Sequence, residues 1–179
     1  MKISFTIQST LLLVSFILIS NISIAQKYSS LKLGAIIPMS EELMINVTNE
    51  KMSLSNNFNE NGLLVIFSCN TCPFVVMWED RYRQLEKMCQ INNVGMVYIN
   101  SNEAKRNGDD SLEEMKKYAK SMGYTFPYLI DQNSAVANAF GAKTTPHIFM
   151  FNSNYQLVYK GAIDDNYEDI NKVKEFYLE

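Results

Sequence analysis

The sequence predicts one α/β domain with a central mixed β-sheet flanked by helices. Short apolar runs of strand length alternate with amphipathic stretches of helix length, which is the pattern of β-α-β units. Two strand-like runs near the end of the chain are separated by a short turn, so the sheet also contains antiparallel strands. The chain of 179 residues is 47% hydrophobic and 20% charged, a composition typical of one globular domain.

The composition also excludes several classes of function. The chain has 16 Lys and Arg against 19 Asp and Glu, so it lacks the basic excess that binds nucleic acid or an anionic membrane. Three cysteines and one histidine are too few for a disulfide scaffold, and a zinc site would need nearly all of them. We therefore expect no nucleic-acid partner, no metal site and no bound cofactor.

Residues 1–25 are typical of a secretory signal peptide. They carry one charge, Lys2, followed by the apolar run 11–19 and by small residues at the positions that a signal peptidase reads. An uncleaved anchor is the alternative, but the run is shorter than the roughly 20 apolar residues that a bilayer-spanning helix needs. We expect cleavage after Ala25, no stable membrane insertion, and a mature domain 26–179 in the periplasm or another extracytoplasmic space.

The first half of this domain is predicted to contain a hairpin and a β-α-β unit. Residues 43–48 and 51–54 are two short strands joined by a turn, which gives an N-terminal hairpin extension. The continuous apolar run 63–67 is typical of a strand that is buried on both faces of a sheet. Residues 74–89 carry apolar side chains at helical spacing, and 94–99 is a second buried strand.

The second half continues the alternation of helices and strands. A capping box at Ser111 begins a helix that Gly123 ends. In chain order, the remaining predicted elements are a strand at 126–130, a short helix at 134–140, a strand at 147–151, its antiparallel partner at 156–160 and a final helix at about 167–178. The sequence indicates neither an internal repeat nor a second domain.

A pair of cysteines lies where the first buried strand ends and the following helix begins. In an exported protein, where disulfides persist, the motif Cys69-Asn70-Thr71-Cys72 indicates redox chemistry. We expect Cys69 at the helix N-terminus, where the helix dipole favours a thiolate, so Cys69 is the candidate nucleophile with a lowered pKa. Cys72, further into the helix and less exposed, is the candidate resolving thiol.

Less reactive interpretations of the cysteines compete with this one. A structural disulfide between Cys69 and Cys72 would close too short a loop to add much stability. A zinc site would need two further ligands from Cys89 and His147, and ordinary burial is less compatible with the polar dipeptide between the cysteines. Cys89 itself lies on the apolar stripe of the helix, where a cysteine acts as a small hydrophobic residue.

Three segments resemble the thioredoxin superfamily, and within it the exported thiol-disulfide oxidoreductases and peroxiredoxin-like redoxin proteins. They are 63–73 (Leu-Leu-Val-Ile-Phe-Ser-Cys-Asn-Thr-Cys-Pro), Thr144-Thr145-Pro146 and 157–161. The resemblance covers about residues 31–179 and implies a thioredoxin-like fold with an inserted β-α unit. It also implies that the Thr145–Pro146 bond is cis and lies against the cysteines, where both residues contribute to substrate binding.

The sequence departs from the superfamily at the motif. The dipeptide Asn-Thr replaces the Gly-Pro of the cytosolic reductant and brings no cation, and the peroxidase pattern P-x-x-x-T-x-x-C is absent. The resemblance therefore implies an enzyme that exchanges disulfides through Cys69 and Cys72, as a reductant. Protein disulfides would be its substrates, and an upstream redox partner would restore the dithiol. A thiol peroxidase with antioxidant activity and a non-catalytic binding module are the alternatives.

Overall fold

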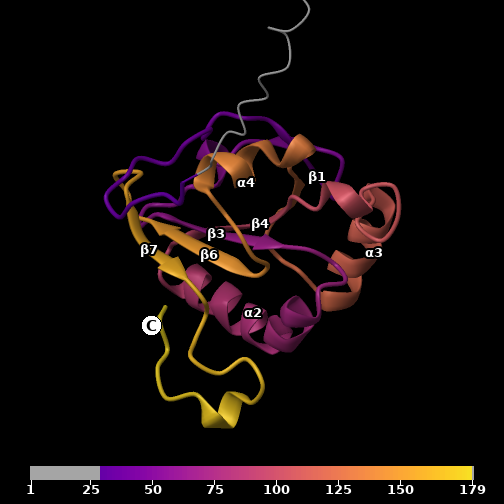
Figure 1. Cartoon of the computed structure of the whole chain (residues 1–179). Helices are drawn as coiled ribbons and strands as arrows, with labels where there is room; N and C mark the ends of the chain where they lie inside the picture. Colours follow the sequence, from indigo (N-terminus) through magenta and orange to yellow (C-terminus); the bar gives the residue numbers. More distant parts are fainter. Residues whose placement is uncertain (1–28, 179) are drawn as a thin grey trace, which may run out of the picture.

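A seven-stranded mixed sheet forms the centre of the computed structural model, which describes residues 29–178 (Figure 1). The predicted signal peptide, residues 1–25, lies outside the described residues. The strands are β1 (Met44–Asn46), β2 (Lys51–Met52), β3 (Leu63–Ser68), β4 (Gly95–Asn100), β5 (Tyr128–Ile130), β6 (His147–Phe151) and β7 (Leu157–Gly161). Within residues 29–178, none of the helices combines the length and the apolar character needed to span a membrane.

The order of the strands across the sheet is β2-β1-β5-β4-β3-β6-β7. Strands β3, β4 and β5 run parallel, whereas β6 is antiparallel to β3 and β7 is antiparallel to β6. At the other edge, β1 and β2 form the predicted hairpin, and β1 pairs antiparallel with β5. The predicted mixed sheet and N-terminal hairpin are therefore confirmed.

Helices cover both faces of the sheet (Figure 1). Helices α2 (Pro73–Ile91) and α3 (Leu112–Met122) pack on one face, and α4 (Ala135–Phe140) packs on the other. The side chains of β3 alternate between the two faces: Leu64 and Ile66 belong to the core under α2 and α3, whereas Val65 belongs to the core under α4. Short 3-10 turns occur at Ser55–Asn57, Glu103–Lys105, Gln132–Ser134 and Ile170–Lys172.

The ends of α3 follow from two residues in the sequence. The hydroxyl of Ser111 accepts a hydrogen bond from the backbone N–H of Glu114 at 3.4 Å, which satisfies one unpaired donor of the first turn. Gly123 ends the helix in the left-handed conformation, with a φ of 67°, which glycine adopts without steric cost. The predicted boundaries of this helix are confirmed.

The predicted final helix is wrong. Within 167–178 the chain forms the 3-10 turn Ile170–Lys172, and Phe176 forms an isolated antiparallel bridge with Asp164, but there is no α-helix. The side chain of Asp165 accepts the backbone N–H groups of Lys174 and Glu175 at 2.9 and 3.2 Å, and a helix over 167–178 would have used these donors internally. Asx side chains that bind backbone donors in this way compete with the helical hydrogen bonds.

A buried ion pair ties this C-terminal segment to α2. The Nε atom of Arg81 lies 3.3 Å from Asp164 Oδ2, and the two side chains are 5% and 0% exposed. Arg81 also donates to the backbone oxygen of Asn166 at 2.7 Å, and its guanidinium lies over the ring of Trp78. These contacts fix the segment after β7 against the helix that follows the cysteine motif.

Candidate active site

The cysteine motif lies in the connection between β3 and α2, and its second cysteine caps the helix. Helix α2 begins at Pro73 with Cys72 as its N-cap, so Cys69 lies three residues before the cap. Cys69 is 4% exposed, whereas Cys72 is half-buried. The expectations that Cys69 begins the helix and is the more exposed thiol are therefore wrong, because proline sets the first helical position after the motif.

The position of Cys72 stabilises its thiolate. Partial burial raises the pKa of the Cys72 thiol, but hydrogen bonds from the Thr145 hydroxyl, from the backbone N–H groups of Val75 and Phe74 and from Cys69 outweigh it, so the pKa is lowered. The two backbone donors belong to the first turn of α2, where N–H groups have no helical partner. Of the two motif thiols, Cys72 is the one whose pKa is lowered and whose side chain is more exposed.

The environment of Cys69 has the opposite effect. Burial raises the pKa of the Cys69 thiol, and the negative charge of Asp110 raises it further. Hydrogen bonds from the Thr145 hydroxyl and the Cys72 backbone offset only part of this. The predicted lowering of the Cys69 pKa is wrong, since the thiol lies before the helix and beside a buried carboxylate. Both cysteines of the motif are reduced in this structure.

The loop before β6 meets both sulfur atoms, although it is 76 and 73 residues from them in sequence. The Thr145 hydroxyl lies 3.5 Å from Cys69 Sγ, and the Cys72 thiol donates to the Thr145 carbonyl oxygen at 3.4 Å. The Thr145–Pro146 bond is cis, as the resemblance implies. The structure thus brings Cys69, Cys72 and Thr145 together at one place.

A buried carboxylate holds the first half of the motif. Asp110 is fully buried, and its Oδ1 accepts the backbone N–H of Asn70 at 2.8 Å and the side-chain amide of Asn100 at 2.7 Å. Its Oδ2 accepts the amide of Asn102 at 2.7 Å. The Asn70 amide donates to the backbone oxygen of Asp109, and its oxygen accepts the Tyr128 hydroxyl at 3.0 Å. The backbone N–H and both side-chain polar atoms of Asn70 are therefore paired.

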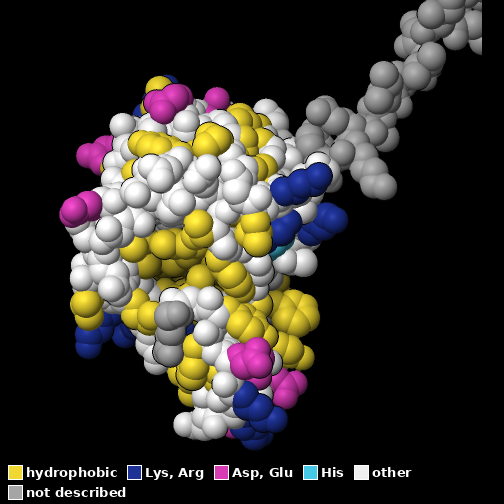
Figure 2. Space-filling view, turned by 90° about the vertical axis from the view of Figure 1, so that its left-hand side faces the viewer, with side chains coloured by type: hydrophobic (Ala, Val, Ile, Leu, Met, Phe, Trp, Pro, Cys, Tyr) yellow, Lys and Arg dark blue, Asp and Glu magenta, His cyan; other side chains and the backbone are white. Residues whose placement is uncertain are grey.

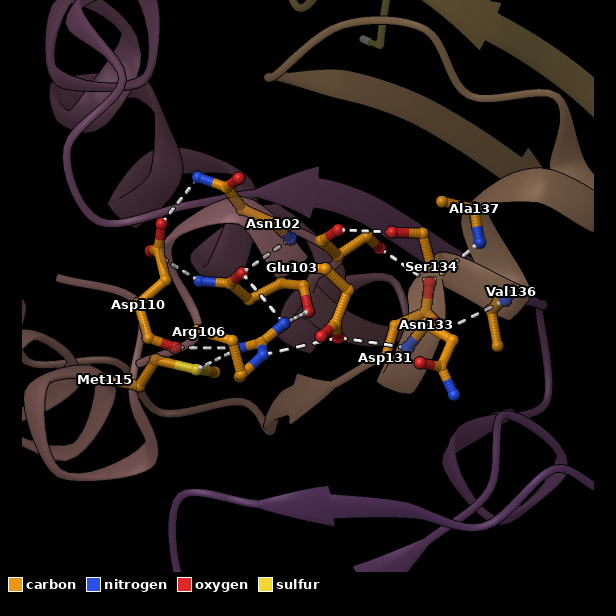
Figure 3. Close-up of polar contacts among 12 residues, drawn as sticks. Asn102, Glu103, Arg106, Asp110, Met115, Asp131, Asn133, Ser134, Val136 and Ala137 are labelled. Carbon is orange, nitrogen blue, oxygen red and sulfur yellow. Dashed lines mark hydrogen bonds and ion pairs between the residues drawn. The ribbon is translucent and has the colours of Figure 1, made fainter. Parts of the chain in front are cut away.

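Figure 3 shows how this carboxylate belongs to a longer polar network. Arg106 donates to the backbone oxygens of Asp110 and Asn100, each at 2.8 Å, and lies 3.4 Å from Glu103. Asp131 accepts the hydroxyl of Ser101 and the N–H groups of the first turn of α4. The network fixes the segment after β4 between the motif and α4.

Lys105 supplies the positive charge that the dipeptide of the motif lacks. Its Nζ lies 3.0 Å from the Thr71 hydroxyl and 3.0 Å from Asp109 Oδ2. Neither Lys105 nor Asp110 was predicted from the sequence. Their position in the segment after β4 could have indicated them. Strands β3 and β4 are parallel, so the segments that follow their carboxyl ends lie at the same edge of the sheet.

A pocket of about 650 Å³ opens beside the two sulfur atoms. It lies between the motif, the segment after β4, α4 and the loop before β6. Its lining includes Cys69, Cys72, Thr71, Lys105, Lys143 and Thr145. A pocket of this volume is within the range of small-molecule sites.

The remaining cysteine lies elsewhere. Cys89 is buried on the apolar stripe of α2, as predicted, and burial raises its pKa to about 12. It lines a second, mainly apolar groove near Tyr159 and Tyr177, on the face where Figure 2 shows hydrophobic side chains around a hollow. Cys89 and the single histidine, His147, do not line the pocket beside the motif. Among residues 29–178, no group of three or more His, Cys, Asp or Glu is arranged to hold a metal ion.

The chain is similar to known redox proteins. The Redoxin family model matches residues 32–176. An uncharacterized conserved protein from Geobacillus kaustophilus is 34% identical, with 75% of this chain and 71% of that chain covered and a TM-score of 0.71.

Two further solved structures are similar in fold. The thioredoxin domain of a thiol-disulfide oxidoreductase from Bacteroides vulgatus is 15% identical, covers 74% and 90% of the two chains and has a TM-score of 0.61. A peroxidoxin from Mycobacterium tuberculosis is 17% identical, covers 77% and 90% and has a TM-score of 0.61. No curated protein matches the chain.

Proposed function

The chain belongs to the redoxin family and has a thioredoxin-like fold, and we propose that it is an exported thiol-disulfide oxidoreductase. The strongest support is that Thr145 contacts the sulfur atoms of both Cys69 and Cys72, and that all three residues line one pocket. A structural cysteine pair would need neither a capping position on a helix nor an open pocket beside it. The chemistry requires only the two thiols and no bound cofactor.

We assign the attacking role to Cys72 and the resolving role to Cys69. The Cys72 thiolate attacks one sulfur of a substrate disulfide, the substrate S–S bond breaks, and the first substrate thiolate leaves and takes a proton from solvent. Cys69 then loses its proton and attacks the Cys72 sulfur, which releases the second substrate thiolate. Two electrons pass from the dithiol to the substrate, and Cys69 and Cys72 end as a disulfide.

The geometry of the two thiols favours this order of events. Cys72 is half-buried beside the pocket and its pKa is lowered, so it is both accessible and ionised more readily. Cys69 is buried and its pKa is raised, so it is protected until a mixed disulfide forms next to it. We propose that the protein acts as a reductant of protein disulfides and that an upstream dithiol partner returns it to the reduced form.

The lowered pKa and exposure of Cys72 also favour a second candidate, a thiol peroxidase in which Cys72 becomes a sulfenic acid that Cys69 resolves. One experiment separates the candidates: turnover of insulin disulfides with dithiothreitol as reductant, run beside hydroperoxide consumption by the same preparation. We expect insulin reduction that is lost in the variant with both motif cysteines replaced by serine. Peroxide consumption without insulin reduction would support the peroxidase, and neither activity would support a non-catalytic binding module.

Export is a separate part of the proposal and needs its own measurement. It is supported by the signal-peptide pattern of residues 1–25. The full chain, expressed in a Gram-negative host, is expected in the periplasmic fraction with Gln26 as its first residue. Recovery of the uncleaved chain in the cytoplasm would contradict export and leave the redox assignment untouched.

A further inference from the structure

We propose that the pocket beside the dithiol binds low-molecular-weight disulfides that carry carboxylate groups. This inference rests on the proposed exchange activity and names a substrate class for it. It extends the proposed function, which concerns protein disulfides, to small anionic molecules. Three properties of the pocket support it, namely its size, the side chains that line it and the sign of its charge.

The pocket has the size and the polar lining of a small-molecule site. Its volume is about 650 Å³, and both cysteines of the motif are among its lining residues. Seven of its lining side chains carry a hydroxyl or amide group, and they are Thr71, Ser101, Asn102, Ser134, Asn138, Thr144 and Thr145. Ser101, Asn102, Ser134 and Thr144 already donate to other groups of the protein. The hydroxyl of Thr71, which accepts from Lys105, and the amide of Asn138 can donate to carboxylate or amide oxygens of a ligand. The second groove, near Cys89, is mainly apolar, and three of its described lining side chains carry an amide or hydroxyl group, namely Asn92, Tyr159 and Tyr177.

The charge of the pocket is opposite to that of the protein. The chain has a formal net charge of -3. Among residues 29–178, however, the charged side chains that line the pocket are Lys105 and Lys143, and no Asp or Glu lines it. The ammonium group of Lys105 is shared with Asp109, whose side chain is 59% exposed and is not part of the lining. Lys143 is exposed and forms no ion pair with any residue between 29 and 178. A negatively charged substrate is therefore favoured over a neutral or cationic one.

The reaction places the charged part of the substrate in the pocket. Cys72 attacks the nearer sulfur of the small disulfide, and the farther half leaves as a thiolate that is protonated by solvent. Cys69 then displaces the retained half, so one disulfide is reduced to two thiols while Cys69 and Cys72 are oxidised. The retained half of the substrate lies in the pocket that Lys105 and Lys143 also line.

The test uses three small disulfides of similar length that differ in charge. These are dithiodipropionate with two carboxylates, bis(hydroxyethyl) disulfide with none, and cystamine with two ammonium groups. The reduced protein, freed of reductant, is mixed with an excess of each, and the loss of its free thiols is followed by alkylation and mass spectrometry. We expect dithiodipropionate to react at a half-saturating concentration roughly fivefold below that of the neutral disulfide, and cystamine to react more weakly than both. Fivefold corresponds to ~1 kcal/mol, the value of one exposed ion pair.

Two variants locate this preference. The ratio to compare is the rate of thiol loss with dithiodipropionate over the rate with bis(hydroxyethyl) disulfide. Lys143→Glu should reverse this ratio, and Lys143→Gln should bring it close to one. Lys87→Gln removes the same charge from an exposed position on α2 that does not line the pocket, so it should leave the ratio unchanged. Added salt should weaken the preference of the unmodified protein.

The outcomes distinguish the two proposals. Equal rates with the anionic and the neutral disulfide, or an equal effect of the Lys87 and Lys143 variants, would overturn the substrate class and leave exchange activity intact. Failure of all three disulfides and of insulin to oxidise the dithiol would overturn the proposed function, and the substrate class with it.

Discussion

Replacement of Asp110 by alanine tests whether the buried network holds the cysteine motif in place. The carboxylate is fully buried and accepts hydrogen bonds from Asn70, Asn100 and Asn102. In Asp110→Ala these donors lose a charged acceptor, and the cost depends on what each can find instead. An unpaired buried donor costs ~1–3 kcal/mol.

The three donors differ in their alternatives. The backbone N–H of Asn70 is left without a partner in a residue that is 8% exposed, so it bears most of the cost. The Asn100 amide keeps its hydrogen bond to the Tyr128 hydroxyl, and Asn102 is half-buried, so water can replace its acceptor. We therefore expect a loss of ~2–4 kcal/mol in the free energy of unfolding, with ~1–3 kcal/mol from Asn70 alone.

The assay is urea unfolding of the reduced protein, with Asp109→Ala as the matched control. Asp109 is the adjacent carboxylate, but its side chain is exposed and, within residues 29–178, paired only with Lys105 at the surface, so its loss should cost ~0–1 kcal/mol. A second readout is the pKa of Cys69, which should fall in Asp110→Ala because the nearby negative charge that raises it is gone. Equal stability losses in the two variants, or a Cys69 pKa that does not move, would mean that the buried carboxylate neither holds the motif nor acts on its thiol.

Three further predictions concern the two thiols and the C-terminal segment. Cys69→Ser should trap substrates as mixed disulfides on Cys72, whereas Cys72→Ser should neither exchange disulfides nor trap substrates. The gel mobility of the adducts checks this, and trapping by Cys72→Ser would reverse the assigned roles. Alkylation of the unmodified protein at increasing pH should modify Cys72 first, because its pKa is lowered and that of Cys69 is raised; coincident midpoints by peptide mass spectrometry would contradict this. Asp164→Ala leaves the guanidinium of Arg81 buried without its counter-ion, so urea unfolding should show a loss of ~3–5 kcal/mol, and a loss below ~1 kcal/mol would mean that the pair is solvated.

Local patterns in the sequence determined most of the fold. The apolar run 63–67 and the helical spacing after it predicted β3 and α2, and Ser111 and Gly123 predicted the ends of α3, because each of these signals lies within one turn or strand. The C-terminal segment did not follow its pattern, since the side chain of Asp165 binds the backbone N–H groups of Lys174 and Glu175, which a helix over 167–178 would have used.

The chemistry of the motif was harder to predict because it depends on long-range contacts. The motif itself was evident, but the assignment of the two thiols depended on the residue at which α2 begins. A difference of three residues moved the capping position from Cys69 to Cys72. Asp110 raises the Cys69 pKa from 41 positions away in sequence, and nothing in the segment around Cys69 indicates that contact.

The two residues between the cysteines are not equally open to change. Asn70 uses its backbone N–H, its amide and its amide oxygen to bind other segments of the chain, so a different side chain there would disturb the loop itself. Thr71 is exposed, and its hydroxyl contacts only Lys105 among the hydrogen bonds of residues 29–178. Selection or engineering that tunes the reduction potential of this dithiol can therefore act at Thr71 with little effect on folding, whereas Asn70 is constrained by the architecture around it.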